Sequence, residues 1–321
     1  MHSFSQLAQQ FEERFINSPL FPAQPENLYA PCSYLLTLGG KRIRPALCVM
    51  GNELFAEAGE DAWHAAAAIE LFHNFTLIHD DIMDKAPLRR GHPTIHAKYG
   101  LTAGILCGDI TCIYAYEQLG KVNSSLHRIL PIFNKTAIEV CEGQQLDMDF
   151  EMRNDVTIAE YINMISLKTS VLLACSLKIG ALLGGATEGN AGRLYSFGKN
   201  MGIAFQLQDD YLDAYGTTDK LGKQNGGDIK ANKKTYLLLK AIENATDQQQ
   251  KEISSWMDNE GEYKIPAILD LYTSTGADIA CRDAVAEYSQ RAFDCLEEVA
   301  ATATRKQHLH ELAAYLLQRE K

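Results

Sequence analysis

Proline and strand-like patterns are scarce in this chain of 321 residues. None of its nine prolines lies between Pro131 and Pro266, and few stretches show the alternation of β-branched residues that strands need. Long segments rich in Leu, Ala, Ile, Lys and Glu therefore predict one helix after another and an all-α fold. We expect helices near residues 3–17, 27–38, 42–56, 62–84, 101–120, 125–144, 157–184, 189–215, 233–245, 247–257, 263–272 and 277–301, and a last one from about 305.

The chain has fewer basic residues than acidic ones. The chain has 30 Lys and Arg against 41 Asp and Glu, which gives a formal net charge of −11. Non-specific nucleic-acid binding needs a basic face, so we expect no nucleic-acid partner. The net charge leaves room for a local basic pocket that binds a small anionic substrate.

The sequence also lacks paired cysteines, a signal sequence and a long uninterrupted apolar run. None of its eight cysteines forms a C-x-x-C pair, which favours reduced thiols and a cytoplasmic location over disulfides or a zinc site. The longest apolar stretch, residues 170–185, is interrupted by Lys178, and its length predicts no transmembrane segment. The N-terminus has no apolar core of the kind that secretory signals carry. Without a low-complexity linker, residues 1–321 are expected to form a single domain.

The stretch LIHDDIMD, residues 77–84, places three aspartates at the end of an apolar helical segment. Asp80 and Asp84 lie about 40° apart on a helix and share a face, with Asp81 at its edge. His73 falls within about 20° of Asp80, two turns earlier. Like charges this close disfavour a helix, whereas carboxylates in this arrangement can bind magnesium. A solvated acidic helix end is the alternative, and this cluster alone leaves it open.

A second cluster repeats the spacing in FQLQDDYLD, residues 205–213, with Asp209, Asp210 and Asp213. Gly202 and Gln206 lie on the same stripe, and a helical Gly costs about 1 kcal/mol relative to Ala, which suggests that space is needed there. The carboxyl end of a helix disfavours anions. Two D-D-x-x-D clusters at helix ends therefore predict bound cations.

Basic residues accompany both clusters. They are Lys41, Arg42 and Arg44 in GGKRIRP (39–45), Arg89 and Arg90 in LRRG (88–91), Lys168 in the apolar run ISLKTSVLL, and Lys220, Lys223, Lys230, Lys233 and Lys234 after the second cluster. Acids and bases together predict an anionic, metal-bound substrate. Diphosphate fits, because magnesium bridges carboxylates to phosphate while Arg and Lys bind the remaining oxygens.

These motifs give the sequence a clear resemblance. The chain resembles trans-isoprenyl diphosphate synthases of the polyprenyl synthetase family over about two thirds of its length. The matching motifs occur in the family's order: GGKRIRP, HDDIMDKAPLRRG (79–91), GILCGD (104–109), EGQQLD (142–147), KTS (168–170), FQLQDDYLD and GKQNGGDIKANKKT (222–235). The resemblance implies the isoprenoid synthase fold, a helical bundle around a deep central cavity, and a homodimer. It also implies condensation of isopentenyl diphosphate with an allylic diphosphate.

The resemblance assigns roles to single residues. It implies that magnesium, with three ions expected, is bound by the two clusters: Asp80, Asp81, Asp84, Asp209, Asp210 and Asp213. Catalytic roles are expected for Asp80, Asp84, Lys168, Asp209, Lys223 and Lys233. Contacts with the allylic substrate are expected from Arg89, Lys168, Thr169, Gln206, Lys223 and Lys233, and contacts with isopentenyl diphosphate from Lys41, Arg44, His73 and Arg90. One departure is Asn232, where the family often has Gly, which affects the expected placement of Lys233.

Product length is expected to depend on the residues just before the first cluster. Phe72 and Phe75 lie three apart and touch on a helix, and Thr76 is small. The resemblance gives bulky residues at these positions a role in limiting chain length, although both could simply be core aromatics. The expected product is geranylgeranyl diphosphate first and farnesyl diphosphate second.

Other functions fit parts of the sequence less well. His79 and Asp80 form a His-Asp dyad like that of HD-type phosphohydrolases, but these do not need the second cluster. Glu70 and His73 form one E-x-x-H, whereas di-iron bundles need two. A terpene cyclase would not need both arginines and a second intact cluster. A longer-chain synthase and a non-catalytic subunit of a heteromeric synthase stay as alternatives.

Overall fold

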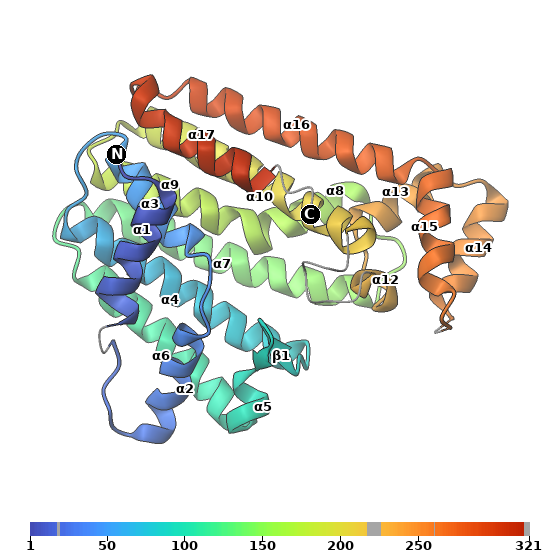
Figure 1. The fold of residues 1–321 in the computed structure, drawn as a ribbon, viewed down its shortest axis with the longest axis horizontal. Helices are drawn as coiled ribbons and strands as arrows, with labels where there is room; N and C mark the ends of the chain where they lie inside the picture. The colour runs from blue at the N-terminus through green and yellow to red at the C-terminus, as the bar shows by residue number, and fades with distance from the viewer. Residues whose placement is uncertain (18–19, 217–225, 260, 318–321) are drawn as a thin grey trace. The chain divides into compact units, whose positions relative to one another are not determined.

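The protein is described by a computed structural model that covers residues 1–17, 20–216, 226–259 and 261–317 (Figure 1). Almost all regular structure is helical, and this confirms the predicted all-α class. The chain folds into two compact units. Unit 1 comprises residues 1–135, 175–195 and 299–309, and unit 2 comprises 136–174, 196–298 and 310–321. The single domain and the deep central cavity stay predictions.

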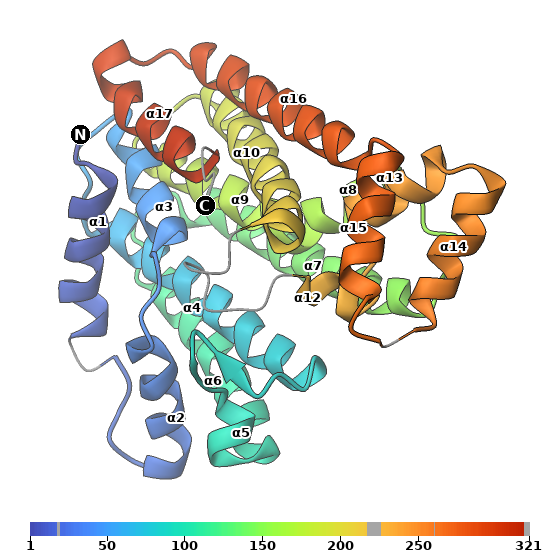
Figure 2. The ribbon, with the colours of Figure 1, turned by 45° about the vertical axis from the view of Figure 1, so that its right-hand side comes forward.

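Unit 1 carries the N-terminal helices and a short hairpin. Its complete elements are α1 (Phe4–Phe11), the π-helical turn η1 (Glu12–Ile16), α2 (Glu26–Thr37), α3 (Ile43–Glu53), α4 (Glu60–Met83), β1 (Leu88–Arg89), β2 (His92–Pro93), α5 (Ile95–Tyr99) and α6 (Leu101–Gly120). Figures 1 and 2 show α4 beside α3 and α6, the two helices against which it mainly packs.

Unit 2 carries the elements that follow, apart from segments shared with unit 1. Its complete elements are α8 (Ile158–Ile165), the π-helical turn η2 (Ser166–Ser170), α12 (Gly227–Lys230), α13 (Tyr236–Asn244), α14 (Asp247–Met257), α15 (Lys264–Ser274) and α16 (Ala277–Glu297). The boundaries between the units fall within α7 (Leu126–Glu151), α9 (Val171–Leu183), α10 (Glu188–Tyr215) and α17 (Ala303–Leu317).

Helix α4 brings the first aspartate cluster to its place. Glu60 and Asp61 lie in its first turn, where acidic side chains favour a helix, and a buried run of alanines follows. The helix ends at Asp84, its C-cap, and Lys85 takes a left-handed conformation with φ of 52°. The three aspartates therefore lie at the carboxyl end of α4, as the pattern predicted.

The segment 85–100, which lies between the helices expected at 62–84 and 101–120, contains regular structure of its own. It holds the antiparallel pair β1–β2, with Arg89 opposite His92, and then α5. The turn residues Arg90 and Gly91 both have positive φ, 53° and 78°, as a two-residue hairpin turn of type I′ requires. The hydroxyl of Thr94 donates to the carbonyl of Ala86 at 2.8 Å and closes the loop.

The apolar helix predicted at 157–184 runs without a break as α8, η2 and α9. Thr157 and Glu160 form a capping box at its start, where the two side chains satisfy each other's backbone N–H groups. At 26 residues, Ile158–Leu183 is long and apolar enough to cross a membrane, so the expectation that this run is too short was wrong about its length. Its apolar window is 78% buried within the protein, and the core helices of soluble proteins pass the same test.

Candidate active site

A cationic cavity of about 460 Å³ lies in unit 1, at the start of α3 and on the adjoining face of α4. It is lined by Gly40, Lys41, Arg42, Ile43, Arg44, Glu70, His73 and Arg90. All four residues expected to bind isopentenyl diphosphate are among them. We call this cavity the anion pocket.

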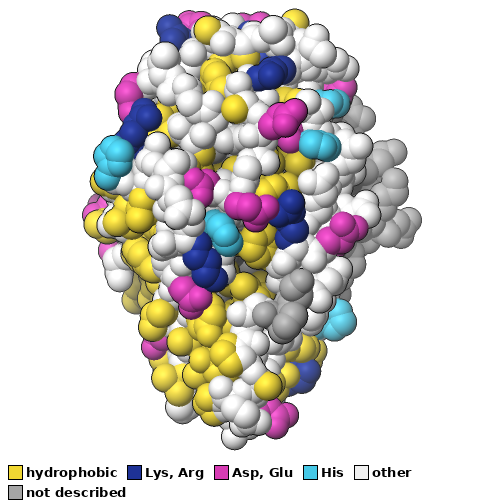
Figure 3. Space-filling model, turned by 90° about the vertical axis from the view of Figure 1, so that its left-hand side faces the viewer, with side chains coloured by type: hydrophobic (Ala, Val, Ile, Leu, Met, Phe, Trp, Pro, Cys, Tyr) yellow, Lys and Arg dark blue, Asp and Glu magenta, His cyan; other side chains and the backbone are white. Residues whose placement is uncertain are grey.

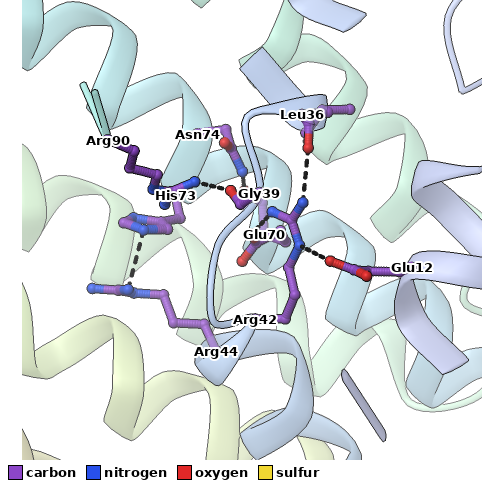
Figure 4. A network of polar contacts seen from close by, with 9 residues as sticks. All are labelled: Glu12, Leu36, Gly39, Arg42, Arg44, Glu70, His73, Asn74 and Arg90. Atoms are coloured by element: carbon purple, nitrogen blue, oxygen red, sulfur yellow. Dashed lines mark hydrogen bonds and ion pairs between the residues drawn. The ribbon is translucent and has the colours of Figure 1, made fainter. Parts of the chain in front are cut away.

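Arg44 and His73 are in direct contact in the anion pocket. The Nη1 of Arg44 donates to the Nε2 of His73 at 3.1 Å (Figure 4). Because a guanidinium has no acceptor, Nε2 must accept, and the ring proton of the neutral histidine lies on Nδ1. Burial, followed by the charges of Arg44 and Arg90, holds the pKa of His73 well below its usual value. Burial also lowers the pKa of Arg44 to about 10, which leaves it charged at neutral pH. The pocket is thus cationic around a neutral histidine.

Arg90 reaches the anion pocket from the hairpin turn. Its Nη1 donates to the carbonyl of Gly39, and its guanidinium lies directly against Gly40. Gly40 has φ of 154°, which L-residues rarely adopt, and a Cβ there would lie 2.9 Å from Arg90 Nη1. The GGK sequence therefore leaves room for an arginine that arrives from another part of the chain.

Replacing Gly40 with Ala is expected to raise the KM for the diphosphate substrate expected in the anion pocket by about ten-fold, because the new methyl group displaces the Arg90 guanidinium and strains the loop. The measurement is steady-state kinetics at a saturating allylic diphosphate. Gly59→Ala is the matched control, since Gly59 caps the start of α4 and a Cβ there meets nothing within 4 Å. An unchanged KM in Gly40→Ala would show that Arg90 does not depend on this space.

The first aspartate cluster divides into one internal and two outer carboxylates. Asp81 is only 2% exposed and accepts two hydrogen bonds from Arg89, each 2.8 Å long, one from Nε and one from Nη2. Asp80 is partly exposed and Asp84 is exposed at the helix end. Asp81 therefore holds the hairpin arginine, while Asp80 and Asp84 lie nearer to solvent, where a cation can reach them.

The second cluster, in unit 2, divides in the same way. Asp210 is 5% exposed and accepts hydrogen bonds from the hydroxyl of Tyr161 and, at 3.3 Å, from the amide of Gln206. Burial raises the pKa of Asp210 to about 7, and the hydrogen bond from Tyr161 opposes the rise. Asp209 and Asp213 are partly exposed, and a carboxylate oxygen of Asp213 accepts from the backbone N–H of Asp228 at 2.9 Å. In both clusters the middle aspartate is internal.

Lys168 lies in the π-helical turn η2, a kind of irregularity that is often found at functional sites. Its Nζ contacts Asp147 Oδ2 at 2.5 Å. Asp147 belongs to the EGQQLD motif, but it was not among the predicted site residues. A lysine within an apolar run calls for a carboxylate partner, and this signal could have led to Asp147.

Thr169 and Gln206 are brought together as expected. The hydroxyl of Thr169 donates to Gln206 Oε1 at 3.4 Å. Gly202, one turn before Gln206, allows this approach, because a Cβ there would lie 2.7 Å from the backbone of Ser170. The space that the sequence indicated at Gly202 is therefore filled by η2.

The structure places Lys233 but not every lysine of its segment. Lys233 is exposed and its Nζ lies 3.4 Å from Asp228 Oδ1. Asn232 has φ of 54°, a conformation that Gly and Asn both tolerate, and its amide donates to the carbonyl of Met257 at 2.9 Å. The departure from Gly at this position is therefore accommodated. Lys220 and Lys223 lie outside the described residues.

The aromatic residues before the first cluster form a contact network in unit 1. The ring centroids of Phe72 and Phe75 are 5.4 Å apart, which confirms their predicted contact. Phe72 also packs at 5.4 Å against Phe133 of α7, and Phe75 packs at 4.9 Å against His79. The hydroxyl of Thr76 donates to the carbonyl of His73 at 2.8 Å. Phe72 is thus a core residue backed from another helix.

The carboxylates of the two clusters suit magnesium rather than a metal held by protein alone. Among the described residues, no three His, Cys, Asp or Glu side chains converge as a closed metal site. Magnesium does not need one, because it keeps several waters and binds through one or two carboxylates plus the substrate's phosphates. The outer carboxylates of each cluster, Asp80 and Asp84 or Asp209 and Asp213, fit this mode.

Comparison with known proteins defines the family. The family model described as polyprenyl synthetase matches residues 25–272. A geranylgeranyl diphosphate synthase of Methanosarcina mazei is 46% identical over 68% of this chain and 69% of its own. A geranylfarnesyl diphosphate synthase of Natronomonas pharaonis is 36% identical over 94% of this chain and 93% of its own. The chain belongs to the polyprenyl synthetase family.

Solved structures agree with this assignment. A crystal structure of a geranylgeranyl pyrophosphate synthase superimposes with a TM-score of 0.94 at 42% identity, and covers 100% of both chains. A polyprenyl synthase of Caulobacter crescentus, solved with calcium and isoprenyl diphosphate, superimposes with a TM-score of 0.88 at 29% identity and covers 99% of this chain and 97% of its own. These neighbours have the isoprenoid synthase fold, as predicted, and polyprenyl synthetases generally use Mg²⁺.

Proposed function

We propose that this protein catalyses the magnesium-dependent, head-to-tail condensation of isopentenyl diphosphate with an allylic diphosphate, which is dimethylallyl, geranyl or farnesyl diphosphate. The product is a short-chain all-trans prenyl diphosphate, geranylgeranyl diphosphate first and farnesyl diphosphate second. The observation that carries the proposal is the pair of neighbouring arginines in the hairpin. Arg89 binds the aspartate cluster and Arg90 lines the anion pocket, so one turn links a cation-binding end of α4 to an anion-binding cavity.

The residues of each unit have distinct tasks in this reaction. Lys41, Arg44 and Arg90 bind the diphosphate of isopentenyl diphosphate, and the Nδ1–H of His73 is available as a donor. The residues proposed to bind the allylic diphosphate are Arg89, Lys168, Thr169, Gln206, Lys223 and Lys233. The outer carboxylates Asp80, Asp84, Asp209 and Asp213 would hold the magnesium ions, three in this proposal, which when bound would supply positive charge to stabilise the diphosphate as a leaving group.

The remaining steps need positioning more than a reactive side chain. The double bond of isopentenyl diphosphate attacks the allylic carbocation from a fixed pose, and this positioning lowers the barrier. The departing diphosphate accepts the proton that is then lost. Apolar walls, including Phe75, keep water from the cation.

The test is a product assay of the purified chain alone. We expect condensation with at least one of the three allylic primers, and chromatography of the dephosphorylated products gives their length. No turnover by the chain alone would favour a non-catalytic subunit, and products of eight or more isoprene units would favour the longer-chain alternative.

Removing divalent cations should abolish turnover, because the aspartates repel a diphosphate unless cations lie between them. Activity is expected to fall below detection in excess EDTA and to return when magnesium exceeds the chelator. EDTA already saturated with magnesium is the control, since it should leave turnover unchanged. Full turnover in excess chelator would contradict the proposed metal dependence.

We also propose a homodimer formed through α6. Its large apolar side chains Leu101, Ile105, Leu106, Ile113 and Tyr116 are all exposed, and the spacing of 105, 113 and 116 places these three on one helical stripe. Figure 3 shows hydrophobic side chains gathered on the lower part of one face. Exposed apolar stripes of this kind favour a protein partner, and a second copy is the one that the family suggests.

A cytoplasmic location and the lack of a membrane span are proposed on separate grounds. The cysteines at positions 32, 48, 107, 175 and 281 are buried as free thiols, as in proteins of a reducing compartment. The burial of Ile158–Leu183 inside the protein supports its role as a core helix.

A further inference from the structure

Arg42 differs from the other basic residues that line the anion pocket, because its guanidinium is held by groups of the protein itself. Its side chain is buried, with only 3% of the residue exposed. Nη1 donates to Glu70 Oε1 at 2.8 Å and Nη2 donates to the carbonyl of Leu36, also at 2.8 Å (Figure 4). Nε lies 3.5 Å from a carboxylate oxygen of Glu12. The guanidinium is thereby joined to α4, to the end of α2 and to η1.

The backbone at Arg42 needs this anchor. Arg42 is the N-cap of α3 and has φ of 51°, a left-handed conformation that residues with a Cβ seldom take unless their surroundings hold them there. The change of direction at Arg42 places Lys41 on one side and starts α3 on the other. If the guanidinium lost Glu70, the loop that carries Gly40 and Lys41 and the first turn that carries Arg44 would both be free to relax.

Glu70 is the one carboxylate among the residues that line the pocket, against the cations Lys41, Arg42, Arg44 and Arg90. It lies on α4 one turn before His73, the residue that Arg44 contacts. Its negative charge supports the charged forms of Arg44 and Arg90, which burial and the charges of neighbouring arginines disfavour. Glu70 thus fixes Arg42 and also balances the cations while no anion is bound.

We propose that the buried Arg42–Glu70 ion pair positions the anion pocket: the two side chains bind each other rather than the substrate, and so set the geometry in which Lys41, Arg44 and His73 bind the diphosphate of isopentenyl diphosphate. This inference rests on the assignment of that substrate to the pocket. Arg42 and Glu70 are accordingly positioning residues.

Single and double substitutions separate positioning from stability. Glu70→Gln keeps the shape of the side chain but removes the negative charge that faces the Arg42 guanidinium. Arg42→Lys keeps the positive charge but loses the two guanidinium nitrogens that donate to Glu70 and to the carbonyl of Leu36. In each we expect the KM for isopentenyl diphosphate to rise on the order of ten-fold to a hundred-fold, the KM for the allylic substrate to stay unchanged, and the Tm to fall. Calorimetric titration with isopentenyl diphosphate in excess chelator should show the same loss of affinity without turnover.

The double variant Arg42→Met/Glu70→Met gives the decisive comparison. Apolar residues of similar volume commonly restore the stability that is lost when one member of a buried ion pair is removed. We expect the Tm to return while the KM for isopentenyl diphosphate stays raised. Recovery of both would show that the pair serves stability alone and would overturn the proposal. So would single variants whose KM for isopentenyl diphosphate is unchanged.

Two controls distinguish the possible failures. Leu194→Ala removes a fully buried side chain of α10 in unit 1, away from the pocket, and should lower the Tm without a change in KM. Arg44→Ala removes a direct contact and should raise the KM for isopentenyl diphosphate. If Arg44→Ala leaves that KM unchanged, the substrate assignment fails. If Arg44→Ala raises it while Glu70→Gln and Arg42→Lys do not, only the positioning role fails.

Discussion

Replacing Asp80 with Asn should lower kcat by a factor on the order of a hundred to a thousand, with little change in the KM for isopentenyl diphosphate. Asp80 lies at the end of α4 as one of the two outer carboxylates of its cluster. In the proposed reaction, negative charge on the leaving diphosphate grows as the allylic C–O bond breaks, so we expect the loss of Asp80 to raise mainly the energy of the transition state. Steady-state kinetics at saturating magnesium, with each substrate varied in turn, measures the effect.

The control is Asp258→Asn, which makes the same chemical change at an exposed position that ends α14. It should leave kcat and both KM values unchanged. A kcat for Asp80→Asn within two-fold of wild type would remove Asp80 from the metal site. A rise in the KM for isopentenyl diphosphate alone would instead place Asp80 in the other substrate's site.

The helical positions of the acidic residues followed from the sequence, but their division into inner and outer carboxylates did not. Helical periodicity placed Asp80 and Asp84 on one face and Asp81 at its edge. It could not show that Arg89, which reaches Asp81 from a hairpin, occupies both oxygens of that carboxylate. The same holds for Asp210, whose hydroxyl partner Tyr161 lies 49 positions earlier in the chain. Contacts between distant segments are not encoded in a local period.

The different roles of the basic residues also could not be predicted from the sequence. The motif GGKRIRP contains Lys41, Arg42 and Arg44. Residue type alone makes all three candidate ligands for an anion. The left-handed backbone at Arg42 turns its side chain into the protein, whereas Arg44 faces His73. Glu70 was considered only as half of an E-x-x-H metal motif. Its partner is in fact a guanidinium 28 positions earlier.

Local chemistry predicted most of the fold because most of the fold is helical. Long apolar periodicities placed α4, α6 and the continuous helix Ile158–Leu183 within a few residues of their observed ends. The hairpin was missed because its strands are two residues long, too short for an alternating pattern to emerge. The two-residue turn with a glycine at its second position was the available signal.

We expect product length to depend on how Phe72 and Phe75 are supported. Phe72 is 2% exposed and is held between Phe75 and Phe133, so it has no room to move. Phe75 is partly exposed and contacts the rings of Phe72 and His79. We therefore expect a growing prenyl chain to meet Phe75 first, with Phe72 packed behind it.

Replacing Phe75 with Ala should lengthen the main product by at least one isoprene unit, because a ring is removed from a close-packed wall. Phe72→Ala alone should cost about 3–5 kcal/mol of stability by leaving a cavity in the core, with a smaller shift in length while Phe75 remains. The double variant should give the longest products, since both layers are then open. Chromatography of the dephosphorylated products measures length, and thermal unfolding measures stability.

Phe11→Ala is the matched control, because Phe11 is as buried as Phe72 and packs against Phe15 at 5.2 Å, away from the aspartate cluster. It should lose stability while its products keep the wild-type length, which separates an opened wall from a loosened fold. Unchanged length in Phe75→Ala, Phe72→Ala and the double variant, with activity retained, would show that the limit on chain growth lies elsewhere. A wild-type product of eight or more isoprene units would show that neither ring limits growth, since a chain of that length has already passed both.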